Sequence, residues 1–242
     1  MTAEVTDTET KSRKVRTIFQ DIADRYDSAS NRISLGRQTA WKRTLTQEIV
    51  TDAKAHEHWK LLDVCTGTGD IAIMVAKSAK NAEVTGVDYS DAMLEKAKEK
   101  GAGSRQIKWE KADALNLPYE DKTFQAAVIS FGLRNTADFF KVLREMKRVV
   151  TDGGHLYVME SCVPENPFVR PFYDLYFKWI MPLLGGGIRK FKDYRWLSNS
   201  THTFPKGSGL RNMMHEVGLE NIRFKNRMFG ACVLVRGQKP LI

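Results

Sequence analysis

The chain has 242 residues, enough for one large domain, and 42% of them are hydrophobic, so it can bury a substantial core. No apolar run approaches the ~20 residues of a membrane-spanning helix, and the polar start lacks the apolar centre of a signal peptide, so we expect a cytoplasmic protein. The three cysteines are far apart, which favours neither a disulfide framework nor a zinc site, and we expect no metal.

The net charge of +9 is compatible with a nucleic-acid partner, an anionic membrane or a solvated basic face. No Asn-Pro-Pro-Tyr-like base-flipping motif follows the fourth predicted strand, which argues against nucleic acid. Basic residues beside apolar ones suit the surface of an anionic bilayer, and a generic basic face stays open as the alternative. The basic residues gather near the start and in an aromatic region: Lys11, Arg13, Lys14, Arg16, Lys178, Arg189, Lys190, Lys192 and Arg195.

The start of the chain predicts two helices before the first strand. Residues 1–11 are polar and rich in threonine, and we expect them to be disordered. From residue 12 onward apolar residues recur at helical spacing up to Ala23, whereas the small polar residues 25–31 predict a break. A second amphipathic helix is expected from about Gln38 to Ile49. These helices can close over a ligand, and Tyr26 could line its cavity.

A glycine turn follows the first predicted strand and is the strongest local signal in the chain. The apolar run 61–64 ends in a turn with Gly67 and Gly69, and a helix-like segment, 71–80, comes next. This order opens a doubly wound α/β domain, in which a ligand lies at the carboxyl end of the first strand. The glycines let the backbone approach that ligand. The next apolar run ends at Asp88, in phase for a ribose hydroxyl.

The remaining pattern alternates helices and strands and closes with a hairpin. Ser90 is a candidate N-cap, and Gly218 is a candidate C-cap. We expect helices at 91–100, 138–150 and 210–217, strands at 106–110, 126–130, 155–160, 221–226 and 230–235, and a turn at Gly153-Gly154. The sequence thus predicts a seven-stranded, mostly parallel sheet.

The segment 164–205 departs from this alternation and is rich in aromatic residues. We interpret it as a helical lid over an apolar substrate, inserted after the fifth strand of a single domain, 12–242, with a flexible break at Gly185-Gly186-Gly187. The alternative is that its aromatics are ordinary core residues. They are Phe168, Phe172, Tyr173, Tyr176, Phe177, Trp179, Tyr194, Trp196 and Phe204.

Two motifs resemble those of known methyltransferases. Asp63-x-Cys65-x-Gly67-x-Gly69 is similar to the first motif of class I enzymes that use S-adenosylmethionine, with Cys65 at the place of a usual glycine. The run Ser130-Phe131-Gly132-Leu133-Arg134-Asn135 resembles the quinone-biosynthesis C-methyltransferases, which act on demethylmenaquinol and related quinol precursors. The resemblance extends from about Phe19 to Gly237.

The resemblance implies a Rossmann-like class I fold with a reversed last strand and S-adenosylmethionine as cofactor. It implies that Arg134 and Asn135 face a prenylated quinol, most simply demethylmenaquinol, and it is compatible with contact at the inner membrane surface and with a homodimer. Arg134 would stabilise the phenolate or order a water that takes its proton, and His202 is a second candidate for the base. The residues implied at the cofactor are Gly67, Thr68, Gly69, Asp88, Asp113, Ala114 and Ser130.

The chain departs from the family pattern at four places, most of them in regions expected to border the acceptor, so use of the cofactor is left intact. Ala29-Ser30 stands where Met-Asn is usual, Gln38 replaces a histidine, Ser161-Cys162 stands where Phe-Ser is common, and Val235 replaces a histidine. An alternative acceptor, another small aromatic or polyketide-like molecule, therefore stays open.

Overall fold

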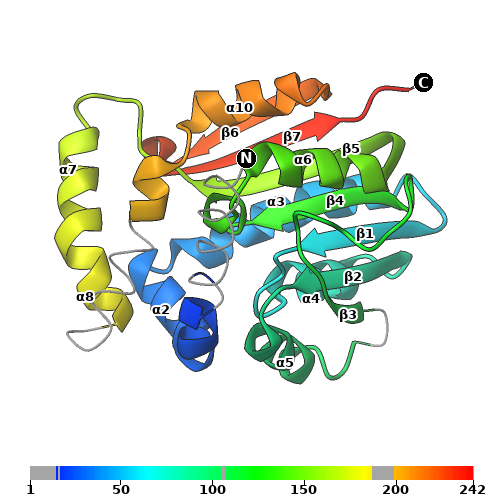
Figure 1. Cartoon of the computed structure of the whole chain (residues 1–242), viewed down its shortest axis with the longest axis horizontal. Helices are drawn as coiled ribbons and strands as arrows, with labels where there is room; N and C mark the ends of the chain where they lie inside the picture. The colour runs from blue at the N-terminus through cyan, green and yellow to red at the C-terminus, as the bar shows by residue number, and fades with distance from the viewer. Residues whose placement is uncertain (1–14, 16, 105–106, 187–198, 242) are drawn as a thin grey trace, which may run out of the picture.

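A seven-stranded sheet of order β3-β2-β1-β4-β5-β7-β6 forms the centre of the computed structural model, which describes residues 15, 17–104, 107–186 and 199–241 (Figure 1). Strands β1 to β5 pair in parallel, whereas β7 runs antiparallel to both β5 and β6. The predicted sheet with its reversed last strand is therefore confirmed. The strands are β1 Trp59–Val64, β2 Ala82–Asp88, β3 Ile107–Lys111, β4 Phe124–Ser130, β5 Val150–Ser161, β6 Glu220–Arg227 and β7 Cys232–Gln238.

Helices cover both faces of this sheet, which explains why its central strands are apolar on both sides. Leu61 points into the core that α3 and α4 cover, and its neighbour Leu62 points into the core under α6 and α10. Helix α5 packs against β2 and β3. The helices are α2 Tyr26–Ile33, α3 Arg37–Ala53, α4 Asp70–Ser78, α5 Asp91–Lys100, α6 Phe139–Val149 and α10 Gly207–Glu216.

Local capping fixes several of these helices where the sequence places them. The Ser90 hydroxyl accepts a hydrogen bond from the Met93 amide at 3.4 Å and begins α5. The Asp138 carboxylate accepts one from the Lys141 amide at 2.8 Å and begins α6. Gly218 follows α10 with a φ of 76°, a left-handed conformation that glycine adopts without strain.

Two predicted breaks are wrong. Residues 26–33 form helix α2, which follows a short 3-10 helix, η1 Ala23–Arg25. Its small residues are held by tertiary packing, since Ala29 is fully buried. Gly153 and Gly154 lie inside β5, where the pairing with β4 shifts register, and Gly154 leaves space for the carbonyl of Gln125.

The predicted lid segment contains one continuous helix beside α2. It comprises α7 Arg170–Leu175, the π-helical turn η3 Tyr176–Ile180 and α8 Met181–Gly186, so the chain stays helical at Gly185 and Gly186 instead of breaking. The Tyr176 hydroxyl donates to the Ile33 carbonyl at 2.6 Å, and Arg32 Nε donates to the Leu184 carbonyl at 3.1 Å. The carboxyl ends of β1 and β4 point to the side where α2, α7 and α8 lie (Figure 1).

Several predictions concern residues outside those described. They are the disorder of 1–11, the basic residues Lys11, Arg13, Lys14, Arg16, Arg189, Lys190, Lys192 and Arg195, and the lid residues Gly187, Tyr194 and Trp196. Within the described ranges, no helix has both the length and the apolarity needed to cross a membrane.

Candidate active site

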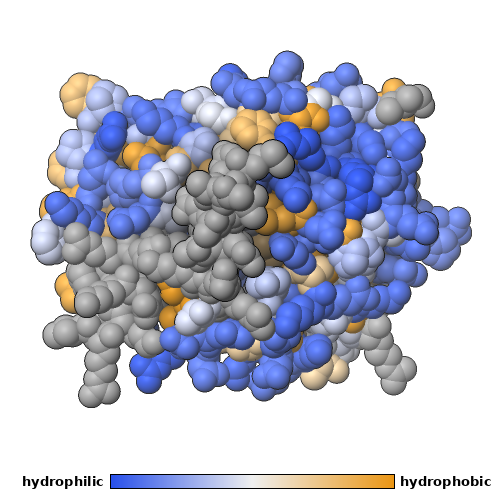
Figure 2. All heavy atoms as spheres, viewed as in Figure 1, coloured by the Kyte–Doolittle hydropathy of each residue, from blue (hydrophilic) through white to orange (hydrophobic). Residues whose placement is uncertain are grey.

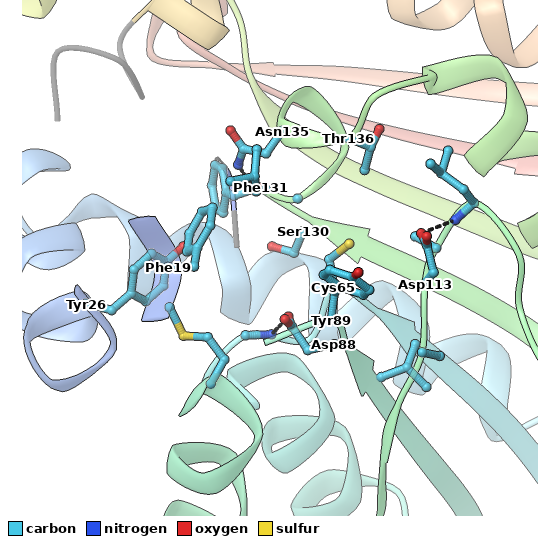
Figure 3. A pocket seen from close by; sticks show the side chains of 18 residues that line it. Phe19, Tyr26, Cys65, Asp88, Tyr89, Asp113, Ser130, Phe131, Asn135 and Thr136 are labelled. Atoms are coloured by element: carbon cyan, nitrogen blue, oxygen red, sulfur yellow. Dashed lines mark hydrogen bonds between the residues drawn. The ribbon is translucent and has the colours of Figure 1, made fainter. Parts of the chain in front are cut away.

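A cavity opens at the carboxyl ends of β1, β2 and β4. Figure 3 shows Phe19 and Tyr26 on one side of it, Asp113 on the other, and Cys65, Asp88 and Ser130 between them. The lining consists of Val15, Phe19, Tyr26, Cys65, Gly67, Val87, Asp88, Tyr89, Met93, Ala112, Asp113, Ala114, Leu115, Ser130, Phe131, Gly132, Asn135 and Thr136.

The loop between β1 and α4 is organised by a buried carboxylate. Asp63 Oδ2 accepts hydrogen bonds from the Thr66 hydroxyl at 2.6 Å and from the Ala72 amide at 3.2 Å. Burial raises the pKa of Asp63 to about 7, even though both bonds act to lower it. Cys65 has a left-handed φ of 53°, which explains why glycine is usual at this place of the motif.

Asp88 stands at the end of β2 with both carboxylate oxygens oriented by backbone amides. Oδ2 accepts from Gly67 at 2.9 Å and Oδ1 accepts from Ser90 at 2.9 Å (Figure 3 draws the Gly67 bond). Burial raises the pKa of Asp88, and these hydrogen bonds oppose the rise. A carboxylate offers about four acceptor positions, so Asp88 can accept a further bond from a hydroxyl group of a ligand.

Three features of this cavity fit a nucleoside-like cofactor. The hydroxyl of Ser130 is buried and has no hydrogen-bond partner among the described residues, so it is available to a ligand. A Cβ built on Gly67 would meet nothing within 4 Å, so the backbone there is open. Asp113 lies opposite, with Oδ1 accepting from the Leu115 amide at 2.9 Å, next to Ala114.

Thr68 and Gly69 lie beneath this cavity rather than in it. The Thr68 hydroxyl donates to Asp27 Oδ1 at 2.7 Å, and Lys100 Nζ bridges Asp27 and Asp70 at 2.6 Å each. Gly69 packs against Trp109, because a Cβ on this glycine would lie 2.5 Å from the indole ring. Both residues therefore support the loop, and Thr68 also lines a smaller neighbouring cavity.

A second cavity adjoins the first and shares the walls formed by Phe19, Tyr26 and Phe131. Its lining is mostly aromatic and aliphatic, and it includes Ser30, Gln38 and Ser161, three of the positions that depart from the family pattern. The remaining lining residues are Ile33, Ser34, Trp41, Arg134, Phe177, Met181 and Thr201.

Arg134 is the charged residue in the lining of the second cavity. Its Nη1 pairs with Oε1 of the fully buried Glu160 and donates to the Phe131 carbonyl at 2.9 Å. Burial is the largest single effect and acts to lower the pKa of Arg134, but Glu160, Tyr26 and Tyr173 together outweigh it and the pKa is raised. Arg134 Nε is buried without a partner in the part of the chain that the structure describes. A ligand oxygen could therefore satisfy it.

The two residues predicted to face the acceptor lie in different cavities. Asn135 lines the first cavity, where its Oδ1 accepts from the Ser200 hydroxyl at 3.1 Å and its Nδ2 donates to the Phe131 carbonyl at 3.4 Å. The candidate base His202 lines neither cavity; its Nε2 lies 3.2 Å from Asp174 Oδ1. Tyr26 lines both cavities, and burial raises its pKa to about 12.

Sequence reasoning did not single out Phe131 as the shared wall or Glu160 as the partner of Arg134. The strand order could have indicated that Glu160 lies near Arg134. Because β5 pairs with β4 in parallel and Ser130 lies opposite Met159, the next residue of β5 comes beside the residues that follow β4.

The sheet order, the reversed β7 and a cavity over the ends of β1, β2 and β4 define the class I methyltransferase architecture. Two of the solved structures that share the fold serve as examples. They are a SAM-dependent methyltransferase from Aquifex aeolicus, 17% identical with a TM-score of 0.55 over 80% of this chain and 88% of that one, and the CurJ carbon methyltransferase, 17% identical with a TM-score of 0.58 over 76% of this chain and 49% of that one.

Sequence comparison identifies the family. A family model described as the ubiE/COQ5 methyltransferase family matches residues 7–239. The demethylmenaquinone methyltransferase of Staphylococcus aureus strain JH9 is 37% identical over 235 residues, which cover 96% of each chain. The chain belongs to the ubiE/COQ5 methyltransferase family. It is a methyltransferase enzyme, and its cofactor is S-adenosylmethionine.

Proposed function

We propose that this protein methylates a ring carbon of a prenylated quinol, converting demethylmenaquinol to menaquinol. The name of the Staphylococcus relative and the family membership support this acceptor. The observation that carries the proposal is the pair of adjoining cavities. One offers a carboxylate and a free hydroxyl, and the other offers an apolar space with a buried cation.

The first cavity is the proposed cofactor site. When bound, S-adenosylmethionine supplies an electrophilic methyl group on a sulfonium. Asp88 would accept from the ribose hydroxyls, Asp113 and Ala114 would contact the adenine, and Ser130 would hydrogen-bond the ligand with its unpartnered hydroxyl. Gly67 would give the backbone its close approach, while Thr68 and Gly69 would hold the loop in shape.

The second cavity is the proposed acceptor site, and Arg134 is its proposed catalytic residue. A quinol ring becomes nucleophilic at carbon when a hydroxyl loses its proton, because the phenolate pushes electron density onto the ring. The Arg134 Nε–H, which lacks a partner among the described residues, would donate to that oxygen and favour its anion. Arginine keeps its own protons, so a water held by Arg134 would accept the one released. Attack by the ring carbon would break the methyl–sulfur bond and release S-adenosylhomocysteine. Loss of the ring proton from the methylated carbon, with reprotonation of the oxygen, would restore the aromatic quinol.

Tyr26 and Asn135 would position groups at the site and would not take part in the reaction themselves. Because the pKa of Tyr26 is raised to about 12, its hydroxyl stays protonated at neutral pH and serves as a donor at the boundary of the two cavities. Asn135 would hold the backbone of Phe131, the wall between cofactor and acceptor. The apolar walls of the two cavities would limit water at the methyl group, which would protect the cofactor from hydrolysis.

The domain organisation is also a proposal. Residues 12–242 would form one methyltransferase domain, with 164–205 as a lid that contributes Phe177 and Met181 to the acceptor cavity. The enzyme would act in the cytoplasm at the inner membrane surface, where a prenyl tail resides. A homodimer stays a prediction, which analytical ultracentrifugation can measure.

Transfer of labelled methyl from S-adenosylmethionine to chemically reduced demethylmenaquinone tests the function. The oxidised quinone and a tailless naphthoquinol serve as matched controls. We expect rapid transfer to the reduced, prenylated ring and none to the quinone, which cannot form the phenolate. Binding of the cofactor without transfer to any quinol would refute the acceptor. It would favour the alternative, another small aromatic or polyketide-like molecule, which Ser30, Gln38 and Ser161 in the cavity lining leave room for.

A further inference from the structure

The helix formed by α7, η3 and α8 is apolar on two opposite faces. Its inner face presents Tyr173 and Met181, which are buried, and Phe177, which is half-buried and lines the acceptor cavity with Met181. Its outer face presents large apolar side chains to solvent: Phe172 is 76% exposed, Leu175 57%, Trp179 52% and Leu183 51%. A helix that is apolar all round is normally buried on all sides.

The outer side chains form one continuous stripe. Phe172, Leu175, Trp179 and Leu183 recur every three or four residues, which places them above one another on a helix. At ~1.5 Å per residue the stripe is about 16 Å long, far too short to span a bilayer but long enough to lie on one. Apolar atoms appear at the edge of the molecule where α7 and α8 lie (Figure 2).

The charges beside the stripe are basic. Arg170 begins the helix, and Lys178 lies beside Trp179 with its Nζ 5.6 Å from the ring centroid. The single carboxylate of this helix, Asp174, is half-buried and pairs with Arg170 at 3.7 Å and with His202 at 3.2 Å. A second copy of this face would bring like charges together, whereas anionic phospholipid headgroups would complement them.

We propose that the outer face of α7, η3 and α8 docks on the surface of an anionic phospholipid bilayer. The inference rests on the proposed function in one respect: the same helix lines the acceptor cavity from its inner face. A prenyl tail would therefore pass from the bilayer along this helix into the cavity, and the ring would reach Arg134 while the tail stays in lipid. Basic residues around an apolar helix face are the usual means of such interfacial binding.

Co-sedimentation with vesicles of phosphatidylcholine and phosphatidylglycerol tests the proposal. The full chain should bind these vesicles, and the double variant Phe172→Ser/Trp179→Ser should bind them about tenfold or more weakly, because it removes two large anchors. The matched control is Leu241→Ser, which removes an apolar side chain that is 83% exposed and lies near the C-terminus, outside the stripe. It should bind as the wild type does. Circular dichroism and cofactor affinity should be unchanged in both variants.

Three results would overturn the proposal. They are no binding of the wild type to the vesicles, equal binding by the double variant, and a wild-type dimer that the double variant dissociates, which would assign the stripe to a second copy. Methylation of a soluble, short-tailed quinol without vesicles separates this proposal from the proposed function. If the docking surface is wrong but the proposed function is right, the soluble quinol is methylated, and the double variant binds vesicles as strongly as the wild type. If the proposed function is wrong but the docking surface is right, no quinol is methylated, and the double variant still binds vesicles more weakly than the wild type.

Discussion

Arg134 and Glu160 form a buried ion pair that joins the end of β4 to the end of β5. Glu160 is fully buried, and its Oε2 also accepts from the Arg134 amide at 3.1 Å while its Oε1 accepts from the Ser161 amide at 2.9 Å. The carboxylate therefore fixes both the side chain and the backbone of Arg134. The direction in which the guanidinium faces the acceptor cavity depends on a residue of the neighbouring strand.

Replacing Glu160 by glutamine should lower both stability and turnover. The substitution leaves the Arg134 charge buried without its counter-charge, and breaking such a pair costs about 3–5 kcal/mol of unfolding free energy. Urea unfolding should show that loss, and the kcat for quinol methylation should fall. The double variant Arg134→Met/Glu160→Gln removes both charges and keeps one acceptor for the Arg134 and Ser161 amides, so it should recover part of the stability and none of the activity. Equal unfolding midpoints for Glu160→Gln and the wild type would contradict this role.

Ser130→Ala should weaken cofactor binding without weakening the fold. The Ser130 hydroxyl has no partner among the described residues, so its removal breaks no bond within the protein, whereas a lost hydrogen bond to the ligand raises the Kd roughly 3–10-fold. Isothermal titration calorimetry measures the Kd, and thermal unfolding provides the stability control. Ser28→Ala is the matched variant, because that hydroxyl bonds the Arg25 carbonyl and lines neither cavity. A lower Tm with an unchanged Kd for Ser130→Ala would count against the assignment.

The two glycines of the turn should respond differently to alanine. In Gly69→Ala the new methyl would lie 2.5 Å from Trp109, so we expect a loss of stability of about 1–3 kcal/mol from overpacking, besides the backbone strain at a φ of 81°. Gly67→Ala meets no atom within 4 Å and carries only the left-handed strain of about 1–2 kcal/mol. Its methyl adds bulk to the cavity lining, so its main effect should be a higher cofactor Kd. Urea unfolding measures the stability of both variants, and calorimetry measures their cofactor Kd. A larger stability loss in Gly67→Ala, or a larger rise in Kd in Gly69→Ala, would contradict this expectation.

Asp63 should make stability fall as pH rises toward neutrality. Its pKa is about 7 in the folded chain against a model-compound value of 3.8. Below about pH 4 the carboxyl is protonated in both states, and its stabilising contribution is complete. Between that pH and about 7 the unfolded chain releases the proton and the folded chain retains it, so this contribution to the unfolding free energy declines. It is lost above the folded pKa.

Urea unfolding at a series of pH values, compared between wild type and Asp63→Asn, isolates this contribution. The variant lacks the titrating group, so its unfolding free energy should decline less over that interval. All other groups titrate in both proteins and cancel in the difference. Parallel curves for the two proteins would show that Asp63 keeps an ordinary pKa in the fold.

Local signals predicted those parts of the fold that depend on local chemistry. The end of β2 and the bounds of α5 agree with the sequence prediction, because both depend on residues close in sequence: Asp88 ends an apolar run, and Ser90 caps the helix. Helix α2 escaped prediction because its polar sequence is held by packing against α8 and by bonds from Arg32 and Tyr176. Tertiary contacts of this kind leave no periodic trace in the sequence.

The same distinction applies to the candidate site. Gly67, Asp88, Asp113, Ala114 and Ser130 line one cavity, since parallel strands bring their carboxyl ends to one edge. The separation of Arg134 from Asn135 into two cavities was not predictable. These neighbours lie on a short 3-10 turn, η2 Leu133–Asn135, and partners distant in sequence, Glu160 and Ser200, decide which way each side chain points.

The wall shared by the two cavities has a kinetic consequence. Two of its members, Phe19 and Tyr26, belong to the helical segment before α3, which Asp27 ties to the cofactor loop through Thr68 and Lys100. Displacing this one segment uncovers both chambers together. Departure of the demethylated cofactor and of the methylated ring would then share one gating step.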